Sequence, residues 1–118
     1  MLTYANAGHY PPMLVRDGTS IRLDAMTPPA GMLPVLPARQ DSVKLATGDW
    51  LLIFSDGIPE AADESGEDFG DRGLLEALGR LGSGTAAEVC AGIVDEVRHY
   101  VREQRQADDI TLIAVKVL

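Results

Sequence analysis

The segment 50–57, with the sequence Trp-Leu-Leu-Ile-Phe-Ser-Asp-Gly, constrains the fold of this chain more than any other. Its first five residues are apolar, which is typical of a short strand buried on both faces. The strand would carry Asp56 to a rim, and Gly57 would let the backbone pass closely around a ligand. Two interpretations are open for the tripeptide Ser55-Asp56-Gly57. It can place a carboxylate for a cation or a proton, or it can be a turn that merely closes a core strand.

The first half of the chain predicts further strands. Residues 2–5 fit a short strand, and 13–16 with 20–23 flank Asp17-Gly18, a pairing typical of a β-hairpin. We expect 24–40, which contains four prolines, to be a long irregular connection that covers part of the molecule. Residues 42–45 alternate polar and apolar, so they are predicted to be the antiparallel neighbour of the strand at 50.

The second half predicts two adjacent helices and a last strand. The first helix has leucines at helical spacing and ends at the Gly-Ser-Gly of 82–84. The second begins with a capping box, Thr85 with Glu88, and continues to about Glu103 along an apolar stripe of Ala86, Cys90, Ile93, Val97 and Val101. Residues 110–117 are rich in β-branched side chains, so we expect a central or nearly central strand.

This order of elements favours an α+β fold. Strands joined by a hairpin and short turns pair antiparallel, and two amphipathic helices need a sheet face on which to bury their stripes. We therefore expect antiparallel sheet or sandwich layers with two packed helices in a single domain, because 118 residues suffice for one small core and not for two.

Composition excludes several classes of function. The net charge of -8 argues against a nucleic-acid partner. No apolar run approaches the roughly 18 residues of a membrane helix, and the start does not resemble a signal peptide, so we expect a cytoplasmic protein without a membrane partner. The single cysteine, Cys90, excludes an intramolecular disulfide and a cysteine-based zinc site.

Aspartates occur at the ends of two predicted strands. Asp56 ends one strand, and Asp108-Asp109 precede another. If these strands are antiparallel neighbours, their carboxylates converge on one edge of the sheet. Oxygen ligands without histidine or cysteine select Mg²⁺ or Mn²⁺, and a pair of such ions activates water for attack on phosphorus. The alternative is that Asp108-Asp109 is only a polar start to a strand.

His9 lies in a loop dense in turn residues, Asn6-Ala7-Gly8-His9-Tyr10-Pro11-Pro12. Its imidazole can donate a proton to a leaving group, or it can hold the loop through hydrogen bonds. Both interpretations are open at this point, and we favour the second.

Four motifs in this order resemble a known family. They are Asn6-Ala7-Gly8-His9 with Pro11-Pro12, Leu51 to Gly57 with Glu60-Ala61, Gly66 to Gly70, and Asp108 to Leu112. Together they resemble the bacterial metal-dependent serine/threonine protein phosphatases of the stage II sporulation protein E branch, which are relatives of the type 2C phosphatases. The resemblance covers essentially the whole chain.

The resemblance implies an antiparallel β-sandwich flanked by helices, with Mn²⁺ or Mg²⁺ at one end and a phosphorylated protein as substrate. Asp56 and Asp108 match metal ligands, while Asp109 falls where relatives have aspartate or asparagine. Gly57 matches the backbone beside the metal, and Asn6 and His9 match a loop or substrate contact. Serine at Ser55 and proline at Pro59 replace the usual threonines, and neither is expected to touch a ligand.

One motif of the family is absent. Members carry a Gly-Asp-Val-Ser-Gly-His-Gly-like segment upstream, whose aspartate bridges two ions, and this sequence has none. We therefore expect residues 1–118 to be a partial phosphatase domain without its N-terminal part. Such a chain would hold at most one ion loosely, show little or no activity, and expose sheet edges that favour a homodimer.

The sequence also suggests two alternative functions. A degenerate, non-catalytic module that binds a phosphoprotein or a regulatory partner fits the missing motif. A haloacid-dehalogenase-like phosphatase would need a nucleophilic aspartate two positions before Asp56, where Phe54 stands, which argues strongly against it.

Overall fold

The computed structural model describes the whole chain except residues 25, 36, 38 and 103–108. Its elements follow in the order β1 (Leu2–Tyr4), β2 (Met13–Arg16), β3 (Thr19–Arg22), β4 (Asp41–Val43), β5 (Trp50–Phe54), α1 (Gly70–Leu81), α2 (Ala86–Val101) and β6 (Leu112–Lys116). The fold is α+β, as the sequence predicts. Among the described residues, no helix has the length and apolar character needed to span a membrane.

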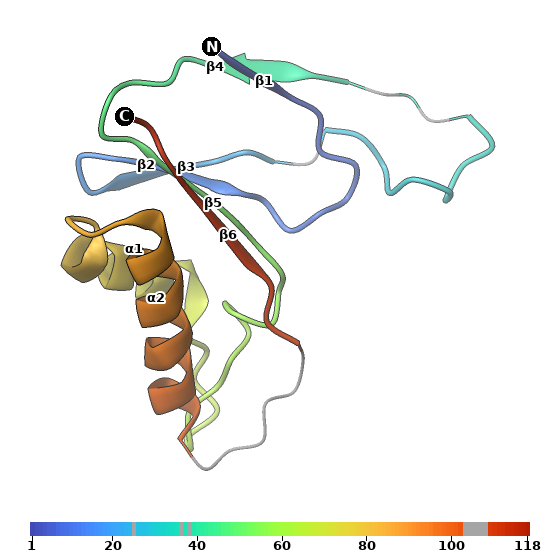
Figure 1. The fold of residues 1–118 in the computed structure, drawn as a ribbon. Coiled ribbons are helices and arrows are strands. Elements are labelled where there is room, and N and C mark those ends of the chain that lie inside the picture. Colours follow the sequence, from blue (N-terminus) through green and yellow to red (C-terminus); the bar gives the residue numbers. More distant parts are fainter. Residues whose placement is uncertain (25, 36, 38, 103–108) are drawn as a thin grey trace.

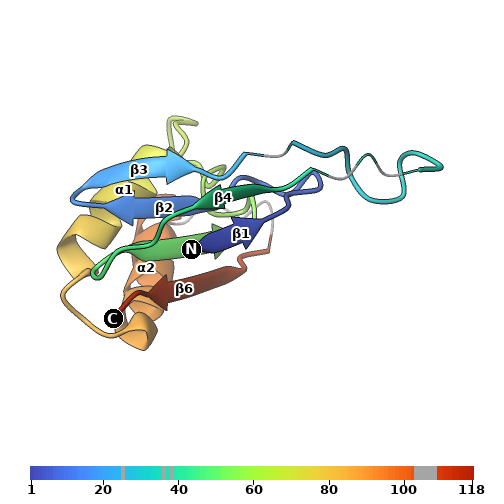
Figure 2. The same cartoon turned by 90° about the horizontal axis from the view of Figure 1, so that it is seen from above.

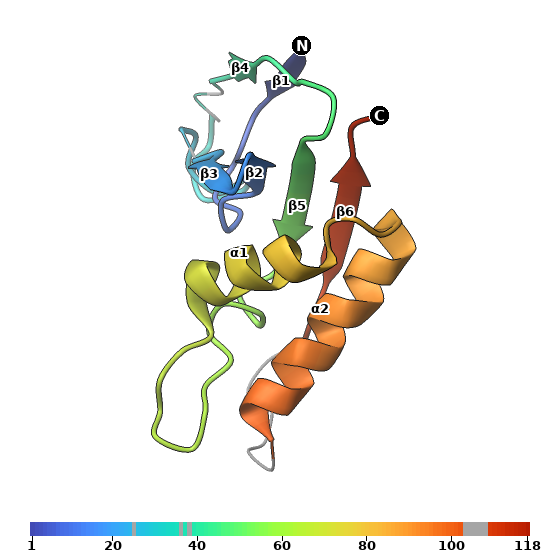
Figure 3. The same ribbon diagram turned by 90° about the vertical axis from the view of Figure 1, so that its left-hand side faces the viewer.

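A four-stranded antiparallel sheet forms the middle of the molecule, in the order β3-β2-β5-β6 (Figure 1). The hairpin between β2 and β3 turns at Asp17 and Gly18, whose φ angles are 50° and 75°. This confirms the predicted hairpin, because a two-residue turn of this kind needs positive φ at both positions. Helices α1 and α2 cover one face of the sheet (Figure 3).

The core lies between this sheet face and the two helices. Leu52, Phe54 and Met13 contribute from the strands and are at most 1% exposed. Helix α1 buries Leu74, Ala77 and Leu78, and helix α2 buries Val89, Ile93, Val97 and Val101. The predicted capping box of α2 is present. The predicted apolar stripe is partly wrong, because Ala86 and Cys90 are only half-buried and the first turns of α2 bury Val89 instead.

The predicted partner of β5 is wrong. Residues 41–43 form β4, which pairs with β1 in a separate two-stranded sheet, with Leu2 opposite Val43. Both edges of β5 are already taken, by β2 on one side and by β6 on the other. A turn at Gly48, with φ of 92°, separates β4 from β5, so these neighbours in sequence enter different layers (Figure 1).

The predicted central position of the last strand is also wrong. Strand β6 lies at the edge of the sheet, and no described strand pairs with its outer side. Its residues Ile113 and Val115 are 51% and 42% exposed. The prediction that the strand at 50–54 is buried on both faces is wrong in the same way, because β5 is fully buried only at alternate residues. β-Branched composition predicts a pleated strand, but it does not reveal whether both edges of that strand have partners.

The long connection between β3 and β4 does not cover the body of the molecule as expected. Its middle extends away from both sheets (Figures 1 and 2), and Met32 and Val35 are 69% and 79% exposed. Among its described residues, the ends are held, for example where Thr27 forms an isolated bridge with Ala7. Prolines remove the backbone donors that would let such a segment join a sheet.

An ion pair between the partly exposed Arg16 and the buried Asp49 fixes the start of β5. The Arg16 guanidinium donates to both carboxylate oxygens of Asp49, at 2.9 and 2.5 Å, and the Ala46 N–H donates to the same carboxylate at 2.8 Å. Asp49 is 1% exposed. The hydrogen bonds from Arg16 lower the pKa of Asp49 from 3.8 to about 2.

This pair predicts a loss of stability in acid. Because the pKa of Asp49 is lower in the folded chain, its contribution is complete above pH 3.8 and disappears as the pH falls toward about 2. The free energy of unfolding, measured in urea at pH values from 5 downward, should fall more steeply with decreasing pH for the wild type than for Asp49→Asn. Asp17→Asn, in the exposed hairpin turn, should keep the wild-type slope; equal slopes for all three chains would contradict the role of the pair.

Candidate metal centre

Strand β5 delivers Asp56 to the rim of the sheet. On either side of Ser55-Asp56-Gly57, Phe54 and Ile58 are 1% and 0% exposed, so the chain is anchored in the core before and after the turn. Gly57 is buried, whereas Asp56 is exposed. Packing thus holds the backbone of this turn and leaves one carboxylate in solvent, in the position that the sequence predicts.

Strand β6 starts beside this turn. Strands β5 and β6 are antiparallel, with Phe54 opposite Leu112. The Ser55 N–H donates to the Thr111 carbonyl, the Thr111 N–H donates to Ser55 Oγ, and Ser55 Oγ donates to the Asp109 carbonyl, each at 3.1 Å. The predicted convergence of the two strand ends is therefore present up to Asp109, which is exposed. Asp108 lies outside the described residues.

Ser55 has a larger part in this arrangement than the sequence indicated. The expectation that Ser55 touches no proposed ligand is wrong, because its hydroxyl donates to the backbone carbonyl of Asp109. A hydroxyl directly before the strand-terminal aspartate is the signal that could have identified it, because serine side chains readily bond to nearby backbone groups.

The donors at this edge fit a hard divalent ion in kind but not in number. Asp56 and Asp109 offer carboxylate oxygens, the ligands that Mg²⁺ and Mn²⁺ prefer. Within the described part of the chain, however, no group of three or more histidine, cysteine or carboxylate side chains is placed to hold an ion. The described residues alone therefore do not make a complete metal site.

Asn6 holds the loop that contains His9. Its side chain is buried and donates to the carbonyls of His9 and Leu23 at 3.1 and 3.0 Å, while its Oδ1 accepts the His9 N–H at 2.8 Å. His9 Nδ1 donates to the carbonyl of its neighbour Tyr10 at 2.7 Å. These bonds favour the loop-holding interpretation of both residues, and none of them reaches the side chain of Asp56.

Tyr10, which the sequence did not single out, ties this loop to the rest of the site region. Its hydroxyl donates to Asp71 Oδ1 at 2.9 Å, at the start of α1, and its ring centroid lies 5.4 Å from that of Phe54. Arg22 forms an ion pair with the same aspartate at 3.7 Å. Burial and the bond to Asp71 raise the pKa of Tyr10 to about 12. The loop thus packs against the strand that carries Asp56.

The acidic loop that follows Asp56 is held by hydrogen bonds among its own residues. The Asp63 carboxylate accepts the N–H groups of Ser65 and Glu67 and the Ser65 hydroxyl, at 2.8 to 3.0 Å. These hydrogen bonds, that of Glu67 first, lower the pKa of Asp63. Its Oδ1 accepts all three of these bonds and shapes a turn, which agrees with the prediction of a solvated loop for this stretch.

The sequence profile of the stage II sporulation protein E (SpoIIE) family matches residues 1–118. The chain belongs to the SpoIIE family. It is 34% identical over 115 residues to protein IcfG of Synechocystis, and this match covers 97% of this chain and 18% of that protein. It is 29% identical over 118 residues to the phosphoserine phosphatase RsbP of Bacillus subtilis, covering 98% of this chain and 27% of that protein.

Structural comparison agrees with this family. The SiaA-PP2C domain of Pseudomonas aeruginosa superposes with a TM-score of 0.82 at 24% identity, covering 98% of this chain and 46% of that chain. This SpoIIE-family chain therefore has the fold of part of a type 2C phosphatase domain, as the resemblance implied. It spans less than a third of the length of the curated relatives that it matches.

Replacing Asn6 tests the loop. Asn6→Ala removes three hydrogen bonds and leaves the N–H and carbonyl of His9 and the buried carbonyl of Leu23 without them. We expect unfolding in urea to require about 2 kcal/mol less free energy, and the His9 amide to exchange its hydrogen faster. Thr3→Ala, which removes an exposed hydroxyl pair with Ser42, should cost far less. An unchanged unfolding midpoint in Asn6→Ala would overturn the assigned role.

Proposed function

We propose that this chain is the C-terminal part of a metal-dependent phosphoserine/phosphothreonine protein phosphatase domain that acts in bacterial signalling. The observation that carries the proposal is the meeting of the Asp56 turn with the Asp109 segment at one end of β5 and β6, in a chain that matches the SpoIIE family over its whole length. The name of the relative RsbP, a phosphoserine phosphatase, supports the substrate class.

Each residue at this edge has a distinct part in the proposal. Asp56 and Asp109, with Asp108, would hold the ion, and Ser55 would fix the backbone of Asp109 relative to Asp56. Bound Mn²⁺ or Mg²⁺ would supply a more acidic water and positive charge to offset that of the phosphoryl oxygens. The exposed carboxylates leave the edge open to a phosphorylated side chain on a protein.

The chain alone is expected to be weakly active or inactive. The described residues provide too few ligands for a complete site, so the remainder is proposed to come from an N-terminal part of the domain. The outer edge of β6, with Ile113 and Val115 exposed, would pair with that part or, in the isolated chain, with a second copy.

A second candidate is a degenerate module that binds a phosphoprotein or a regulatory partner without hydrolysing it. The observation that favours it is the incomplete donor set among the described residues. The two candidates differ in whether the gene encodes the upstream aspartate motif and in whether Asp56 contributes to metal affinity.

Calorimetric titration of Mn²⁺ into the 118-residue chain tests the role of Asp56. We expect weak binding of at most one ion, because few carboxylates are available, and loss of that binding in Asp56→Asn. Asp17→Asn removes the same charge at the far hairpin turn and should bind as the wild type does. Binding that persists unchanged in Asp56→Asn would contradict the assignment.

Activity must be measured in the complete protein. There, Asp56→Asn and Asp108→Asn should each lower the rate of phosphoserine-peptide hydrolysis by more than about a hundredfold, because metal ligands act on both affinity and chemistry. Asp17→Asn serves as the control for charge. Wild-type rates in both ligand variants would exclude the proposed phosphatase site.

A further inference from the structure

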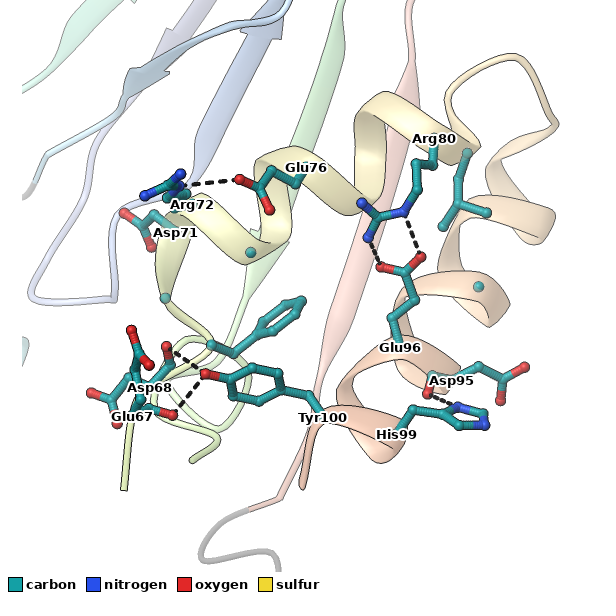
Figure 4. Close-up of a pocket in the computed structure, with 15 residues that line it drawn as sticks. Glu67, Asp68, Asp71, Arg72, Glu76, Arg80, Asp95, Glu96, His99 and Tyr100 are labelled. Atoms are coloured by element: carbon teal, nitrogen blue, oxygen red, sulfur yellow. Dashed lines mark hydrogen bonds and ion pairs between the residues drawn. The ribbon is translucent and has the colours of Figure 1, made fainter. Parts of the chain in front are cut away.

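A groove of about 940 Å³ runs between the two helices on the side away from the sheet (Figure 4). Its described lining comes from the loop 67–69, from α1 and from α2, and includes none of the residues that these helices bury against the sheet. None of the described lining residues is fully buried. The groove is therefore an open surface feature, which suits a peptide segment better than an enclosed small molecule.

The floor of the groove is apolar and well fixed. The rings of Phe69 and Tyr100 meet edge to face with centroids 5.3 Å apart. The Tyr100 hydroxyl donates to the carbonyls of Glu67 and Asp68, at 2.9 and 3.2 Å, and so attaches the end of α2 to the loop before α1. An aromatic surface that does not need to reorganise costs little entropy when a partner binds.

Glycines in both helices make room for apolar side chains that line the groove. A Cβ on Gly73 of α1 would lie 2.7 Å from the Phe69 ring, and one on Gly92 of α2 would lie 2.7 Å from Leu81 Cδ1. At the other end, the Arg80 guanidinium donates to both carboxylate oxygens of Glu96 and links the two helices. The shape of the groove is thus set by packing and by a bidentate ion pair.

The walls carry a large excess of negative charge. The described lining contains six carboxylates and two arginines, a difference equal to half of the net charge of the chain, -8. Among the described residues, the side chains of Glu67, Asp68 and Asp95 have no ion-pair partner. Desolvation and then the carboxylates of Asp63, Glu67 and Asp68 raise the pKa of Tyr100.

We infer that this groove is a docking surface for a positively charged peptide segment of a partner protein, one that carries an aliphatic or aromatic anchor. Figure 4 shows Tyr100 between the carboxylates of the loop and those of α2, an arrangement that favours an arginine or lysine lying against an aromatic ring. Phosphate groups would be repelled here, so this surface is distinct from the proposed phosphatase edge and does not depend on it.

A labelled synthetic peptide of arginine, lysine and leucine tests the inference, with fluorescence anisotropy measured on the 118-residue chain. Asp68→Asn/Asp95→Asn should weaken binding by about threefold to tenfold, as expected for two exposed charge pairs. Asp17→Asn/Asp41→Asn removes the same charge from the hairpin turn and β4, and should weaken it less than about twofold. A peptide with glutamate in place of arginine and lysine should not bind.

Amide chemical shifts in the wild-type chain give a readout that does not depend on variants. Addition of the basic peptide should perturb amides mainly within 67–73 and 92–100. Equal weakening by both double variants, or shifts spread over all acidic surfaces, would reduce the effect to general attraction to an acidic protein and overturn the inference. Shifts confined to the exposed face of β5 and β6 would overturn it as well.

Discussion

The pairing of β5 on both of its edges is the constraint on which the rest of the structure depends. Its backbone hydrogen bonds go to β2 on one side and to β6 on the other. Its inward residues Leu52 and Phe54 are almost completely buried beneath α1 and α2. Because strand, sheet and helix layer share these side chains, the position of the turn after Phe54 is fixed by the whole core.

The two sides of the sheet differ in completeness. One face is closed by helices, whereas the other retains exposed Ile113 and Val115 beside the small β1–β4 sheet. At the Asp56 edge, likewise, the described residues contain no group of three or more side chains placed to hold an ion. Both observations agree with a chain that corresponds to 46% of a solved relative's domain.

Local signals in the sequence were reliable where neighbouring residues carry the energy. The Asp17-Gly18 turn, the capping box of Thr85 with Glu88 and the leucine periodicity of α1 predicted their elements correctly, because each relies on contacts within a few residues. The arrival of Asp56 at a rim followed from the apolar run before it. Its meeting with Asp109 was predicted only on the condition that the two strands pair, and they do.

By itself, the sequence determined the α+β class, the hairpin, both helices and the family, since periodicity, caps and motif order are local or linear properties. Tertiary structure decided that β4 pairs with β1, that β6 lies at an edge, and that Tyr10 and Ser55 connect the site region to Asp71 and Asp109. The physical reason is that strand partners and hydrogen bonds between distant residues depend on which edges and donors remain free after the core has formed, and no short pattern in the chain encodes that outcome.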